Sequence, residues 1–152
     1  MNAEPIAADR LAELVEGLDG LERGDRIDAL IALAGRFREV AGEVARRPFA
    51  EDRRVPGCES QAFVWATERG DGTLDFHFAV ENPQGISAKA MAVILGECLS
   101  GAPLDQVAAV PVGVVERIFG PELSMGKSLG LTGMVQFVQR EARQRLGAAA
   151  GR

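Results

Sequence analysis

A cysteine in a proline-glycine turn is the first feature of this chain that could do chemistry. Cys58 stands in the stretch RRVPGCESQAFVWA, directly before residues that favour a β-strand. A cysteine nucleophile reacts as its thiolate, which nearby positive charge stabilises. Arg53 and Arg54 precede it, and Gly57 removes a side chain that would hinder a second molecule, whereas Glu59 favours the thiol. The segment therefore indicates either a reactive cysteine or a thiol that fills an apolar gap at a turn.

The other thiol and the single histidine are weaker candidates. Cys98 lies in the apolar stripe of a predicted helix, where a thiol behaves as an inert hydrophobe. His77 lies on the more polar face of a predicted strand, and a cysteine-dependent hydrolase or peroxidase would need it to reach Cys58. Two widely spaced cysteines and one histidine form no zinc or iron-sulfur pattern, so neither a metal nor a cofactor is expected.

A glycine-rich stretch, GPELSMGKSLGLTGM, covers residues 120–134. Its glycines do not have the spacing of a phosphate-binding loop. Gly130 and Gly133 lie inside a helical pattern, where each costs about 1 kcal/mol relative to alanine, so we expect another backbone to pack closely there. Lys127 stands at the entrance of this helix, where it either extends into solvent or holds an anionic sulfur species.

Length and composition limit the classes of protein to consider. The chain has 152 residues, of which 47% are hydrophobic, and fits a single domain over residues 1–152. A net charge of -5, no tyrosine and one tryptophan argue against a nucleic-acid partner. The first residues lack a basic segment followed by an apolar run, and no stretch is long enough for a membrane span. We therefore expect a cytoplasmic protein with reduced cysteines and no membrane partner.

Hydrophobic periodicity predicts helices on both sides of a hairpin. One helix is expected near residues 11–18, and a second, capped by Asp25, continues until Pro48 forbids it. Residues 48–57 indicate an ordered loop or a short edge strand. Strands at 61–68 and 73–80 form the hairpin, with one face of the second strand buried by Leu74, Phe76, Phe78 and Val80.

The second half of the chain is predicted to be helical. The apolar spacing indicates helices at 91–99, 112–119 and 131–142, and the tail, residues 147–152, is expected to fray. The order of helices, hairpin and helices predicts an α+β fold in which the helices pack on one face of the sheet.

The cysteine segment also resembles a known family. RVPGCESQAFVW is similar to the active-cysteine segment of the SufE family of sulfur-acceptor proteins, in which a P-G-C-x-S-Q turn leads into a strand with aromatic residues. The helix AKAMAVILGECLSG and the closing LSMGKSLGLTGMVQFV are similar in order and spacing to the rest of that family. The resemblance covers a core of about residues 10–145.

This resemblance implies a fold and an activity. The fold is a small antiparallel sheet of about three strands with helices against it, as in iron-sulfur scaffold proteins. The activity is to take sulfur from the persulfide of a SufS-like, pyridoxal-phosphate-dependent cysteine desulfurase, to stimulate that enzyme, and to pass the sulfur to iron-sulfur scaffold proteins. Such a protein is a transfer partner and not itself an enzyme.

The resemblance also assigns residues. Cys58 matches the acceptor cysteine, and Arg54, Gly57, Gln61 and Lys127 are the supporting residues. Lys127 stands where many members carry arginine, and VENPQG replaces a more usual acidic run.

Protection of a persulfide requires a sheltered resting place. We expect the turn to tuck the thiol against apolar side chains, with Phe63, Trp65 and Leu129 as wall residues. Two other functions stay open at the level of sequence. One is a thiol hydrolase or peroxidase that uses Cys58 with His77, and the other is an interaction module that stimulates a partner without carrying sulfur.

Overall fold

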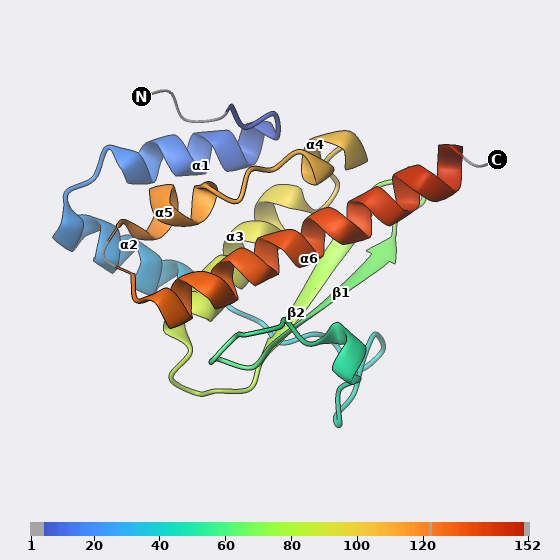
Figure 1. Cartoon of the computed structure of the whole chain (residues 1–152), viewed down its shortest axis with the longest axis horizontal. Coiled ribbons are helices and arrows are strands. Elements are labelled where there is room, and N and C mark those ends of the chain that lie inside the picture. The colour runs from blue at the N-terminus through green and yellow to red at the C-terminus, as the bar shows by residue number, and fades with distance from the viewer. Residues whose placement is uncertain (1–4, 122, 151–152) are drawn as a thin grey trace.

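The computed structural model describes residues 5–121 and 123–150, and it has the predicted α+β architecture. Its elements, in chain order, are α1 (Asp9–Asp19), α2 (Arg23–Ala34), the short 3-10 helix η1 (Glu51–Arg53), β1 (Ala62–Glu68), β2 (Leu74–Val80), α3 (Ile86–Leu99), α4 (Leu104–Ala108), α5 (Val114–Phe119) and α6 (Met125–Ala150). Figure 1 shows α6 running across the whole molecule, with the β1–β2 hairpin on one side of it and α1, α2 and α5 on the other.

The hairpin confirms the alternating pattern in the sequence. β1 and β2 are antiparallel, with Val64 opposite Phe78. Leu74, Phe76, Phe78 and Val80 all lie on the buried face, where α3 and α6 cover the sheet. Asp71 and Gly72 close the turn, since the Asp71 carboxylate accepts the Thr73 N–H at 3.0 Å and Gly72 has a φ of 86°.

A loop, not a helix, covers the other face of the hairpin. Val40 donates its N–H to the carbonyl of Phe78 at 2.8 Å, which ties the loop to β2. Phe49 then packs between two side chains of β1, with ring centroids 5.2 Å from Phe63 and 5.0 Å from Trp65. This small second core explains why aromatic residues occur on both faces of the sheet.

The end of the second helix was predicted wrongly. α2 ends at Ala34, and Gly35 follows it, so the chain leaves the helix well before Pro48. The reason is tertiary, because the segment after Gly35 is needed to cover the sheet. Asp25 also does not cap the helix but lies in its first turn, with Glu22 at the cap position.

Over residues 5–121 and 123–150, two strands form the sheet where the resemblance implied about three. Beside β1, where a third strand would lie, the segment before Cys58 forms only an isolated antiparallel bridge between Arg54 and Phe63. It cannot continue as a strand, because Pro56 lacks an N–H and Gly57 turns the chain with a φ of 70°.

Helices α3 and α6 form the centre of the structure. α3 is buried along most of its length, as its apolar sequence predicted. α6 begins before the predicted residues 131–142 and continues to Ala150, so residues 147–150 of the expected frayed tail are helical, while 151–152 lie outside the described residues. Among the described residues, no helix combines the length and apolar character of a membrane span.

Candidate functional site

Cys58 lies at the tip of a loop that is closed at its base by backbone hydrogen bonds. Val55 donates its N–H to the carbonyl of Ala62 at 2.9 Å, and within the loop Gln61 donates to the carbonyl of Cys58 at 3.1 Å. Gly57 and Gln61 both take left-handed backbone conformations, with φ of 70° and 54°. That region is easy for glycine and uncommon for glutamine, so the loop holds Cys58 between two sharp changes of direction.

Three glycines of α6 form a seat for this loop. Gly126, Gly130 and Gly133 recur at helical spacing and face the loop together. A Cβ on Gly130 would lie 3.1 Å from both Cα and Sγ of Cys58, and one on Gly133 would lie 2.7 Å from Cγ1 of Val55. A Cβ on Gly126 would collide with the carboxylate of Glu59.

The close approach predicted for Gly130 and Gly133 is therefore confirmed. Gly126 was missed, although its position one helical turn before Gly130 is a signal that the same reasoning could have used.

The thiol of Cys58 is sheltered beside a small cavity. The side chain is buried, with 9% of the residue exposed. The cavity has a volume of about 140 Å³. Its wall combines the cysteine loop with the first turns of two helices: Cys58, Glu59 and Ser60 from the loop, Gln84, Gly85, Ile86, Ser87 and Ala88 around the start of α3, and Gly126, Lys127, Gly130 and Leu131 from α6.

This wall carries more positive than negative character. The N-terminal ends of α3 and α6 both contribute to it, and the start of a helix bears partial positive charge. Lys127 adds an ammonium group, and Glu59 adds one opposing carboxylate. An anionic sulfur in the cavity would thus be stabilised by two helix ends and one lysine.

The segment before the cysteine is fastened to α6 by a part-buried ion pair. Arg53 donates to the carboxylate of Glu141 at 2.8 Å, and the guanidinium lies 5.6 Å from the ring centroid of Phe137. Glu141 is almost fully buried, and Arg145 approaches the same carboxylate at 3.6 Å. The base of the loop is thereby held while its tip rests on glycines.

The predicted supporting residues do not all gather at the thiol. Lys127 lines the cavity, and Gly57 gives the loop its turn. Gln61 contributes its backbone, while its side chain is exposed. Arg54 is exposed, lies 3.8 Å from Glu51 and is outside the cavity wall.

The expected wall residues were wrong. Phe63 and Trp65 belong to the second core on the opposite face of the sheet, because alternate residues of a strand point to opposite faces. Leu129 is exposed and lines a separate groove with Pro56 and Gly57. Leu131 and Ile86 are the larger apolar side chains that border the cavity of Cys58 instead.

Neither of the two other candidates reaches the cavity. The His77 ring lies on the loop-covered face of the sheet, with Nε2 2.8 Å from the hydroxyl of Thr67. Cys98 is buried in the main core, where burial raises the pKa of its thiol to about 11. Within the described ranges, no group of three or more histidine, cysteine or acidic residues is placed to hold a metal.

Comparisons with known proteins agree with this fold. A sequence model of the SufE family, described as an Fe-S metabolism associated domain, matches residues 12–142. A solution structure of a hypothetical protein from Thermus thermophilus is similar, with a TM-score of 0.71 and 26% sequence identity over 92% of this chain and 98% of that one. A search of curated proteins found no match.

Proposed function

Because the chain belongs to the SufE family and so to Fe-S metabolism, we propose that it accepts and carries sulfur on Cys58. The donor is the persulfide of a pyridoxal-phosphate-dependent cysteine desulfurase, and the receivers are iron-sulfur scaffold proteins. The observation that carries the proposal is the position of the thiol, which lies at the tip of a loop, against the Gly130 backbone and beside a cavity.

The cavity is large enough for the outer sulfur atom of a Cys58 persulfide. A persulfide adds one sulfur atom to the cysteine, and about 140 Å³ is close to the roughly 150 Å³ of a protein cavity that binds benzene. Leu131 and Ile86 give the cavity apolar surface, while Lys127 and the helix ends favour the anionic form of the terminal sulfur. The site is thus suited to holding a persulfide between two partners.

The transfer balances without an added oxidant. The thiolate of Cys58 attacks the terminal sulfur of the donor persulfide, and a new sulfur-sulfur bond forms as the donor's sulfur-sulfur bond breaks. The donor cysteine leaves as a thiolate and takes up a proton, which replaces the proton that Cys58 gave up. The products are a Cys58 persulfide and the donor thiol.

The loop tip must leave its seat for this attack, because the buried thiol is out of reach of a partner's cysteine. Gly57 supports such motion, since a Cβ built there would have no atom within 4 Å and the tip is exposed on that side. The base stays in place through the pairing of Val55 with Ala62 and the Arg53–Glu141 ion pair. We propose that residues 56–59 swing out to the donor and return to the cavity with the sulfur, while the carbonyls of Ser60 and Gln61 stay bonded to the backbone after β2.

Intact-protein mass spectrometry tests the proposal. After incubation with desulfurase and cysteine, the protein and its Cys98→Ala variant should gain the mass of one sulfur, and Cys58→Ser should gain none. A mass gain in Cys58→Ser would refute the assignment. Full stimulation of the desulfurase by Cys58→Ser would instead favour an interaction module, and loss of transfer in His77→Ala would favour the cysteine-histidine enzyme.

A further inference from the structure

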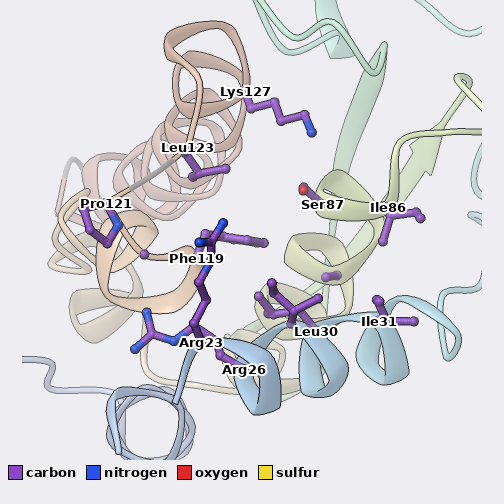
Figure 2. Close-up of a pocket in the computed structure, with 13 residues that line it drawn as sticks. Arg23, Arg26, Leu30, Ile31, Ile86, Ser87, Phe119, Pro121, Leu123 and Lys127 are labelled. Carbon is purple, nitrogen blue, oxygen red and sulfur yellow. The ribbon is translucent and has the colours of Figure 1, made fainter. Parts of the chain in front are cut away.

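A second, larger hollow lies beside the cavity of Cys58. It has a volume of about 460 Å³ and is bounded by α2, the start of α3, the end of α5 and the start of α6. Ile86, Ser87 and Lys127 line both this hollow and the cysteine cavity, so the two share a wall. Figure 2 shows Lys127 extending from α6 toward Ser87 of α3, at this shared boundary.

The walls of the hollow expose apolar side chains that the fold does not use. Ile27 and Ile31 of α2 are 46% and 53% exposed, and Ile86 of α3 is 50% exposed. Leu30 and Phe119 lie deeper in the same hollow. Single exposed apolar residues are ordinary, but several around one concave surface indicate a binding site.

Positive charge accompanies these apolar walls. Arg26 and Lys127 line the hollow, although the chain as a whole has a net charge of -5. The Nε atom of Arg26 is buried and has no hydrogen-bond partner among the described residues. The guanidinium of Arg26, which lines the hollow, can pair with an incoming carboxylate.

We propose that this hollow docks a segment of the persulfide-donor protein that presents apolar side chains next to carboxylates. The inference rests on the proposed function. A stable interface buries about 800 Å² on each partner, far more than the tip of one loop provides, so a donor that reaches Cys58 must also cover adjacent surface. The hollow is concave and lies next to the cavity of Cys58. Apolar side chains of a partner would fit its apolar walls, and carboxylates beside them would pair with its positive charges.

Kinetics of sulfur transfer from the desulfurase of the same organism tests the proposal. The variants are the double substitution Ile27→Ser with Ile31→Ser, for the apolar contact, and Arg26→Gln, for the charge. Val112→Ser is the matched apolar control, since Val112 is 42% exposed and lies outside the hollow, and Arg38→Gln is the matched charge control at an exposed site elsewhere. All five substituted positions lie outside the wall of the cavity of Cys58.

The double variant should raise the apparent KM for this protein as sulfur acceptor by about tenfold, with an unchanged rate at saturation. Arg26→Gln should raise KM by several fold and weaken its dependence on salt. The controls should match the unsubstituted protein. Urea unfolding midpoints, read by circular dichroism, verify that each variant is folded.

The outcomes separate this inference from the proposed function. Unchanged KM values in folded hollow variants, with sulfur still arriving on Cys58, would overturn the docking site alone. A lower rate at saturation with unchanged KM would also overturn it. Absence of sulfur on Cys58 in the unsubstituted protein would overturn the function.

Discussion

Gly130→Ala tests whether the cysteine loop is seated on α6 as described. The new Cβ would lie 3.1 Å from both Cα and Sγ of Cys58, whereas ordinary contacts of this kind begin near 3.4 Å. Alanine in a helix is favoured over glycine by about 1 kcal/mol, and overpacking of a well-packed site costs about 1–3 kcal/mol. The net change should be a loss of about 0–2 kcal/mol in the free energy of unfolding.

A matched control separates helix propensity from the contact. Gly17 also lies within a helix, α1, but a Cβ there would have no atom within 4 Å. Gly17→Ala should therefore stabilise the protein by up to about 1 kcal/mol. The two variants should differ by about 1–3 kcal/mol in urea denaturation, since only one of them forces the loop from its seat.

Thiol labelling gives the second readout. In a Cys98→Ala background, the rate of alkylation by iodoacetamide reports on Cys58 alone. Gly130→Ala should increase this rate, because the displaced loop exposes the thiol, and Gly17→Ala should not change it. Equal stabilisation by both substitutions, with equal labelling rates, would refute the seating of Cys58 on α6.

Two further predictions concern buried groups. Glu141→Ala should lower the free energy of unfolding by about 1.5–3 kcal/mol, because it removes the charged hydrogen bond of 2.8 Å to Arg53, whose side chain is 29% exposed; a loss below about 1 kcal/mol, which is typical of exposed pairs, would contradict a part-buried tether. Burial raises the pKa of Cys98 to about 11 from an ordinary 9.0, so the folded protein loses stability between those two values, where the unfolded thiol ionises first. Denaturation at pH 8 and pH 11 should show a smaller loss in Cys98→Ala than in the unsubstituted protein, and equal losses would contradict this.

The parts of the fold that depend on local sequence patterns were predicted correctly. The alternation of Leu74, Phe76, Phe78 and Val80 identified the buried face of the hairpin, because a strand has a period of two. The close contact at Gly130 also followed from local reasoning, since glycine inside a helix needs a packing reason.

Errors arose where distant segments meet. The second helix was expected to continue to Pro48, but the chain after Gly35 instead covers the outer face of the hairpin, and no local pattern distinguishes these outcomes. Phe63 and Trp65 were expected to shelter Cys58, yet both point to the opposite face of the sheet. The sequence near Cys58 did not show which face of β1 lies next to the cysteine loop, because tertiary packing decides it.

The cavity itself was only partly predictable. Cys58 and Lys127 were named from the sequence, and both line it. The start of α3, including Gly85 and Ser87, was missed, because the ENPQG turn gave no sign of packing against the cysteine loop. A Cβ on Gly85 would lie 3.0 Å from the Ser60 hydroxyl, which shows how tightly these two turns meet.

Single-turnover transfer from a preloaded donor tests the central claim most directly. The desulfurase is loaded with isotopically heavy sulfur from labelled cysteine, freed of substrate and mixed with this protein. Peptide mass spectrometry of alkylated samples over time then locates the label. The account predicts that label leaves the donor cysteine as it appears on the peptide containing Cys58. Label that stays on the donor, or that appears on the peptide of Cys98, would contradict it.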